Sequence, residues 1–139
     1  MNDIGIHIRN TLKSQYFKNI ISQTLRESQG VLFAYLFGSC VTGVVTESSD
    51  IDIALFLEKK RPDLDDYLSL HLKLSRALGT DKIDLLIINN TRNIILLDSI
   101  VRHGIIIHDG DRERRELFEL NILHSAIDFK EQRRFLVGR

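Results

Sequence analysis

The sequence contains little cysteine, proline or tryptophan: among 139 residues there are one cysteine, one proline and no tryptophan. The single cysteine, Cys40, excludes an internal disulfide and a zinc site built from cysteines, which fits a reducing compartment. Net charge is also absent, because 19 lysines and arginines balance 19 aspartates and glutamates. No overall field therefore draws the chain to nucleic acid or to a membrane, and we expect it to bind neither directly.

Long apolar runs are missing as well. No stretch approaches the roughly 18 apolar residues of a membrane-spanning helix. The first five residues lack the basic segment and apolar core of a signal peptide. We therefore expect a soluble cytoplasmic protein. The length suits one domain, residues 1–139, that buries roughly two thirds of the surface exposed by the unfolded chain.

The apolar pattern predicts a mixed α/β fold. Apolar residues at helical spacing predict one or two helices within residues 1–30. Strands are predicted where apolar residues follow one another, at 31–37, 51–57, 82–88 and 104–108. Helices are predicted at 62–78, at 91–102 and from 112 onward. The order of elements predicts a sheet of three to four strands flanked by helices, with a long C-terminal helix over 109–139.

The helix ends are predicted from single residues. Pro62 is expected in the first turn of its helix, where its missing N–H has no cost. Thr91 is expected as an N-cap. Gly79 and Gly104 are expected at helix C-termini, where glycine is favoured.

Three carboxylates interrupt the apolar strands. Asp50 and Asp52 stand at the start of the second strand, and Asp84 stands near the start of the third. Residues two apart in a strand point to the same face, so Asp50 and Asp52 should lie side by side. Like charges that close repel each other unless they share a proton or hold a hard cation such as Mg²⁺. A turn cap or a solvated strand end is the alternative explanation for an Asp-x-Asp pair.

A glycine and a serine precede this pair. Gly38 and Ser39 close the first strand, where a glycine allows a turn to bring backbone N–H groups and a hydroxyl near phosphate oxygens. Gly43 and a small, polar segment at 46–49 then return the chain to the second strand. If the first two strands are neighbours, the turn and the carboxylate pair lie beside each other.

These residues resemble the signature of the nucleotidyltransferase superfamily related to DNA polymerase beta. That signature is Gly-Ser, a spacer, Asp-x-Asp, and a third acid on a later strand. Here it reads Gly38-Ser39, Asp50-Ile51-Asp52 and Asp84. The resemblance covers about residues 31–89. The small size and the long C-terminal helix resemble the minimal nucleotidyltransferases, the MNT group, whose MntA-type antitoxins are encoded beside a HEPN-domain toxin.

The resemblance implies a role for each signature residue. Gly38 and Ser39 would hold the β and γ phosphates of ATP. Asp50, Asp52 and Asp84 would bind two Mg²⁺ ions, and Asp84 would also act as the base for the incoming hydroxyl. The catalytic core would span 31–108.

The resemblance also implies an activity and a partner. MntA-like proteins transfer AMP from ATP to a tyrosine of the HEPN-domain toxin and so neutralise it, which implies a hetero-oligomer. Two other functions stay open. One is an antitoxin that acts by occlusion with its nucleotide site unused, and the other is a nucleotidyltransferase with a small-molecule acceptor.

One residue departs from the family pattern. Many members have an arginine directly after Gly-Ser, where this chain has Cys40. Three cations are candidates to replace that arginine, namely Lys82, Arg92 and Arg102. We interpret Cys40 as a packing residue rather than a nucleophile. The five histidines are scattered singly and show no metal-ligand spacing.

Overall fold

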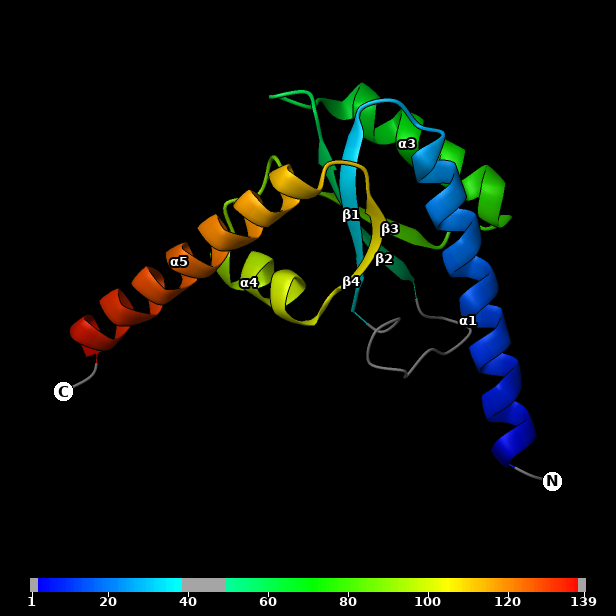
Figure 1. The fold of residues 1–139 in the computed structure, drawn as a ribbon, viewed down its shortest axis with the longest axis horizontal. Helices are drawn as coiled ribbons and strands as arrows, with labels where there is room; N and C mark the ends of the chain where they lie inside the picture. Colours follow the sequence, from blue (N-terminus) through cyan, green and yellow to red (C-terminus); the bar gives the residue numbers. More distant parts are fainter. Residues whose placement is uncertain (1–2, 39–49, 138–139) are drawn as a thin grey trace.

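A computed structural model describes residues 3–38 and 50–137 (Figure 1). Along the chain its elements are α1 (Asp3–Arg26), β1 (Val31–Phe37), β2 (Ile51–Leu57), α3 (Leu64–Leu78), β3 (Ile83–Ile87), α4 (Ile94–His103), β4 (Ile105–Asp109) and α5 (Arg112–Val137). The predicted mixed α/β fold with a long C-terminal helix is confirmed. The opening segment, for which one or two helices were predicted, forms one long helix in its described part.

Within the described residues the strands form one four-stranded sheet in the order β3-β2-β1-β4. β1 pairs antiparallel with both β2 and β4, whereas β2 pairs parallel with β3. The first two strands are therefore neighbours, which was the condition for the turn and the carboxylate pair to lie beside each other. Because β3 lies at an edge, one side of its backbone has no strand partner.

Two layers of helices cover the two faces of the sheet. α1 and α3 pack on one face, where Leu25, Leu74 and Ile53 are fully buried in a single cluster. α4 and α5 pack on the other face, against Phe33 and Tyr35. Burial on both faces explains why the strands are apolar at nearly every position.

The helix ends confirm some predictions and correct others. Gly79 ends α3 in the left-handed conformation, with φ of 72°. Pro62 was wrongly placed: Asp63 is the N-cap of α3, in a capping box with Asp66, so the proline lies before the helix. Thr91 was also wrongly placed, since Asn93 caps α4 through a hydrogen bond from Leu96 N. The Thr91 hydroxyl instead accepts from Asn93 N at 3.2 Å, upstream of the helix.

Gly104 follows α4 as predicted, but for a steric reason. Its backbone is extended, with φ of −70°, so no left-handed conformation is involved. A Cβ at this position would lie 2.5 Å from Ile100 O and 3.2 Å from Leu36 O. The glycine therefore allows the end of α4 to approach the end of β1.

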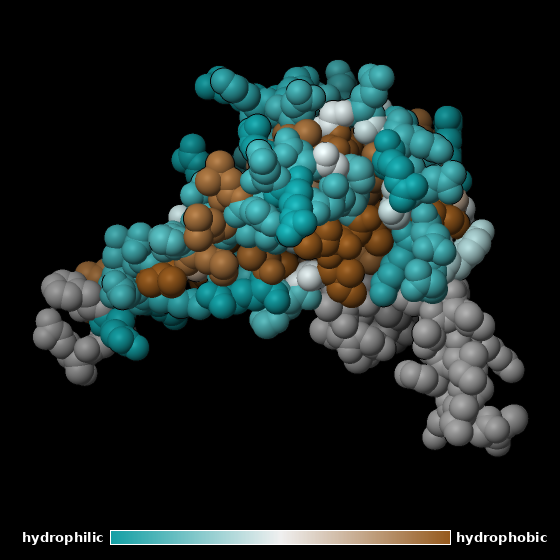
Figure 2. All heavy atoms as spheres, viewed as in Figure 1, coloured by the Kyte–Doolittle hydropathy of each residue, from teal (hydrophilic) through white to brown (hydrophobic). Residues whose placement is uncertain are grey.

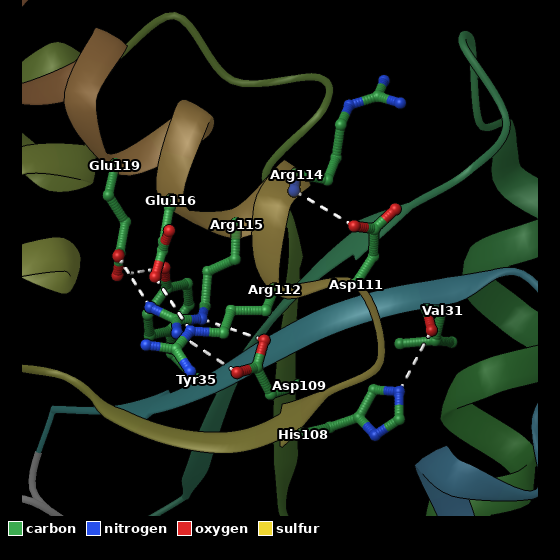
Figure 3. A network of polar contacts seen from close by, with 10 residues as sticks. All are labelled: Val31, Tyr35, His108, Asp109, Asp111, Arg112, Arg114, Arg115, Glu116 and Glu119. Carbon is green, nitrogen blue, oxygen red and sulfur yellow. Dashed lines mark hydrogen bonds and ion pairs between the residues drawn. The ribbon is translucent and has the colours of Figure 1, made fainter.

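A partly buried polar network fastens α5 to the sheet (Figure 3). The Tyr35 hydroxyl donates to Glu119 Oε2 at 2.8 Å, and Arg115 donates to Glu119 Oε1 at 2.8 Å. The same guanidinium forms a two-pronged ion pair with Asp109 of β4, at 2.9 and 3.1 Å. Burial, followed by the hydrogen bond to Glu119, raises the pKa of Tyr35 well above its ordinary value, so the phenol remains a donor.

Beyond this network α5 extends past α4 and away from the sheet (Figure 1). Figure 2 shows hydrophobic side chains along it. Leu117, Leu120 and Ile127 are each at least half exposed. None of the helices in the described ranges is both long enough and apolar enough to cross a membrane.

Asn89 extends the sheet beyond the end of β3. Its side-chain amide accepts from Leu57 N and donates to Leu57 O, both at 2.8 Å, as a strand partner would. Leu57 is only 5% exposed, so water cannot replace these bonds fully. The amide therefore closes the end of the β2–β3 ladder.

We predict that Asn89→Ala lowers the free energy of unfolding by about 1–3 kcal/mol, because it leaves two buried backbone groups without partners. Urea denaturation measures this loss. Asn121→Ala, on the exposed surface of α5, is the control and should change stability by less than about 0.5 kcal/mol. Equal stability of the two variants would contradict the role assigned to Asn89.

Candidate functional site

The parallel ladder between β2 and β3 brings two carboxylates together. Asp52 is the register partner of Asp84, one residue after Ile51 pairs with Ile83. Partners in register project their side chains to the same face of a sheet. That face is the one covered by α4 and α5, because the neighbouring residues Ile53 and Leu85 belong to the opposite cluster.

Asp50 lies just before β2 and is exposed. It lies at the mouth of the strand, which begins at Ile51 as predicted. Its charge nevertheless acts on Asp52, as does the charge of Asp84. The three predicted acids therefore lie at one end of the sheet, where β2 and β3 begin and β1 ends.

This grouping of charges changes the acidity of Asp52. Burial raises its pKa above the ordinary value of 3.8, and the repulsion of Asp84, then of Asp50, raises it further. A hydrogen bond with Asp84 acts in the same direction. Without a cation the site therefore favours proton uptake.

Gly38 lies directly against Asp52. It follows β1, whose last residue, Phe37, is the register partner of Asp52. Gly38 has a φ of 72°, and an added Cβ would collide with Asp52 Oδ2 and lie 3.1 Å from Asp52 Cγ. Only glycine allows the turn to approach the carboxylate this closely. The predicted neighbourhood of the turn and the carboxylate pair is therefore confirmed at Gly38.

Other features of a ligand site are absent from the residues that the structure describes. Within 3–38 and 50–137, no three histidine, cysteine or acidic side chains are placed to hold a metal ion. Two open cavities, of about 420 and 530 Å³, lie near the other end of β2, one beside Leu57 and the other beside Pro62. Neither is lined by Asp52 or Asp84. Ser39, Cys40 and Gly43, on which the predicted phosphate turn depends, lie outside the described residues.

A known protein family matches the part of the chain that contains these site residues. Residues 19–113, more than half of the chain, match the family described as polymerase beta, nucleotidyltransferase. The chain belongs to this nucleotidyltransferase family. No curated protein matches it.

Solved structures resemble this nucleotidyltransferase over nearly its whole length. A chain from a toxin–antitoxin complex with AMP-PNP has a TM-score of 0.71 and 27% identity, covering 87% of this chain and 95% of that one. A chain from the complex of tri-AMPylated Shewanella oneidensis HEPN toxin with MNT antitoxin has a TM-score of 0.67 and 26% identity, covering 90% and 96%. A chain from the MntA–HepT complex has a TM-score of 0.66 and 26% identity, covering 89% and 96%.

The cations considered for the nucleotidyltransferase site lie at different ends of the sheet. Lys82 is at the acid end, two residues before Asp84, and its carbonyl accepts from Ile51 N at 3.0 Å. Arg102 is also at this end, in the last turn of α4, and donates to Asp98 at 2.8 Å. Arg92 follows the far end of β3. Lys82 and Arg102 are therefore better placed than Arg92 to serve a nucleotide.

Sequence reasoning overlooked His71, because it treated the histidines as isolated. The structure places the His71 ring beside the strand that bears Asp84, with Nε2 3.2 Å from Ile83 O. Tyr67, His71 and Ser75 stand four residues apart on α3, and this spacing was the available signal.

We predict that Asp52→Asn stabilises the protein without added metal. A carboxyl whose pKa is raised by folding lowers stability once the pH exceeds that pKa, since the folded state then carries a charge it disfavours. Asparagine removes the charge and can still donate to Asp84. The melting temperature should rise by roughly 2–4 °C at pH 7.

The gain should shrink as the pH falls toward 3.8, the ordinary value for aspartate, because the wild-type carboxyl then takes up its proton. Thermal melts from pH 7 to pH 4 test both statements. Asp65→Asn, an exposed position on α3, is the control. A lower melting temperature for Asp52→Asn at pH 7 would refute the prediction.

We predict that Gly38→Ala destabilises the protein more than Gly79→Ala does. Both glycines have φ of 72°, so a side chain is strained equally at either position, by about 1–2 kcal/mol. A Cβ at Gly79 meets nothing within 4 Å, whereas at Gly38 it meets the Asp52 carboxylate. In urea denaturation, Gly38→Ala should lower the free energy of unfolding by about 1 kcal/mol or more beyond the loss seen for Gly79→Ala. Equal losses would mean that the contact with Asp52 relaxes freely.

Proposed function

We propose that this protein is an antitoxin that transfers AMP from ATP to a tyrosine hydroxyl of a partner HEPN-domain toxin and so neutralises it. The observation that carries the proposal is the in-register pair Asp52 and Asp84 in a nucleotidyltransferase fold. We treat residues 1–139 as one nucleotidyltransferase domain, with a catalytic core over 31–108.

The donor set fits Mg²⁺. Asp52 and Asp84 offer oxygen ligands, which Mg²⁺ prefers, and their repulsion raises the pKa of Asp52, so a cation is electrostatically favoured there. With Asp50 they would hold two ions, although no ready-made cluster of three ligands exists among the described residues. Bound Mg²⁺ would offset the charge of the triphosphate and lower the pKa of the attacking hydroxyl.

The remaining roles belong to the chain itself. Gly38, through its backbone, and Ser39 would hold the β and γ phosphates. Asp84 would accept the proton of the tyrosine hydroxyl. The tyrosine oxygen would form a bond to the α phosphorus, and the bond from that phosphorus to the β phosphate oxygen would break, releasing pyrophosphate. Such a reaction depends mainly on positioning and charge.

The comparisons support the partner and its AMPylation. The matching chains come from toxin–antitoxin complexes, one with AMP-PNP and one with a tri-AMPylated HEPN toxin. This chain covers at least 95% of each of these two. The exposed apolar side chains of α5, Leu117, Leu120 and Ile127, provide a surface that a partner could cover.

Neutralisation by occlusion is the second candidate. The observation in its favour is that the similar chains are found bound to their toxins. A small-molecule acceptor has no comparable support, because the described residues form one sheet with its covering helices and show no additional substrate-binding domain.

We predict that Asp50→Asn/Asp52→Asn lowers AMP transfer to the co-expressed toxin by about 100-fold or more, because the acids no longer hold the cation. Intact mass spectrometry of the toxin, in steps of one AMP, measures the transfer. Asp65→Asn should transfer normally. If the double variant still neutralises the toxin without modifying it, occlusion is the mechanism. Absence of any modification by the folded wild-type protein would refute the proposal.

A further inference from the structure

His71 fills a gap in the hydrogen bonding of the edge strand. Lys82 O accepts from Ile51 N at 3.0 Å, so this carbonyl points toward β2. Successive carbonyls of a strand alternate in direction, and Ile83 O therefore points off the edge of the sheet. His71 Nε2 lies 3.2 Å from this carbonyl oxygen. A side chain of α3 thus takes the place of a missing strand.

The contacts of the ring determine its tautomer. A carbonyl can only accept, so His71 Nε2 must carry the hydrogen. In the neutral ring Nδ1 is then an acceptor, and the Ser75 hydroxyl lies 3.3 Å from it. Tyr67 stacks on the same ring, with centroids 5.9 Å apart and planes 26° apart. The Ile83 carbonyl of β3 therefore sets the tautomer, and Tyr67 and Ser75 of α3 hold the ring in place.

The peptide group that receives this hydrogen bond leads directly into Asp84. The carbonyl carbon of Ile83 is bonded to the backbone nitrogen of Asp84, so the planar peptide sets the direction in which the Asp84 side chain leaves the strand. β2 fixes the strand at Lys82 on one side, and His71 fixes it at Ile83 on the other. A rotation of this peptide would move the Asp84 carboxylate relative to Asp52.

We propose that His71 is a positioning residue for Asp84, and that it holds the β3 edge so that Asp84 stays in bridging distance of Asp52. Ser75 supports it by keeping Nδ1 as the acceptor. This inference rests on the proposed function for its effect on catalysis, but the tether itself is a property of the fold. His71 contacts neither nucleotide nor acceptor in this role.

The test compares His71→Ala with His71→Gln, whose side-chain amide can also donate to Ile83 O. Ser75→Ala removes the support for the tautomer, and His124→Ala, an exposed histidine on α5, is the control. Hydrogen exchange of the segment 80–87 measures the tether. Binding of Mn²⁺ together with a non-hydrolysable ATP analogue, followed by electron paramagnetic resonance, measures the cation site. Thermal melts establish that each variant is folded.

For His71→Ala we expect faster exchange across 80–87 and a Kd for Mn²⁺ raised about 10-fold, as when an outer partner of a metal ligand is removed. His71→Gln should restore both to within about threefold of wild type. Ser75→Ala should give an exchange rate and a Kd between those of His71→Gln and His71→Ala. His124→Ala should match wild type in both. A variant that only weakened the fold would not be rescued in this way.

Two results separate the inference from the proposed function. Unchanged exchange and unchanged Mn²⁺ binding in folded His71→Ala overturn the inference and leave the proposed function intact. A wild-type protein that binds no Mn²⁺ and modifies no toxin overturns the proposed function. In that case, rapid hydrogen exchange in His71→Ala that returns to the wild-type rate in His71→Gln still supports the tether from His71 to Ile83 O. Unchanged exchange in His71→Ala rejects the tether.

Discussion

The pairing of Asp52 with Asp84 across the parallel β2–β3 ladder is the constraint on which the site depends. A sheet register offset by one residue would send one of the two carboxylates to the opposite face, into the cluster formed with α1 and α3. The apolar residues that alternate with the acids prevent this shift, because they must face that cluster. Hydrophobic burial therefore fixes the distance between two like charges that would otherwise separate.

This arrangement leaves the site under electrostatic tension in the absence of a cation. Burial and two neighbouring acids raise the pKa of Asp52, and the left-handed turn at Gly38 brings backbone against the same carboxylate. Glycine adopts this conformation without strain, so the tension lies in the Asp52 carboxylate, and a perturbed pKa of this kind is typical of functional sites. A divalent ion would relieve the repulsion between the carboxylates. The folded site therefore favours the binding of a cation.

The sequence was sufficient to predict the strands, because apolar periodicity is a local property, and it marked Asp50, Asp52 and Asp84 as exceptions to that pattern. The in-register pairing of Asp52 with Asp84 was not predicted, because the register between two strands depends on how they pack in the fold. The sequence placed Gly38 beside Asp52 on the condition that β1 and β2 are neighbours, and the structure meets that condition. The helix caps at Asp63 and Asn93 were missed, since several polar residues competed for each position. His71 was missed for a different reason. The spacing of Tyr67, His71 and Ser75 was visible in the sequence, but the partner of His71, Ile83 O, is a backbone group on another element that no side-chain pattern marks.

The edge position of β3 connects these observations. A central strand has its carbonyls paired on both sides, whereas β3 has β2 on one side only and must take its other support from helix α3. The acid on this strand is therefore held by two unlike elements, a ladder and a side chain. The opposite edge is secured differently, through Arg115 of α5 on Asp109 of β4. Because the two edges rely on separate helices, a partner bound to α5 would not need to disturb the geometry of Asp84, so binding and chemistry could reside in different parts of the same chain.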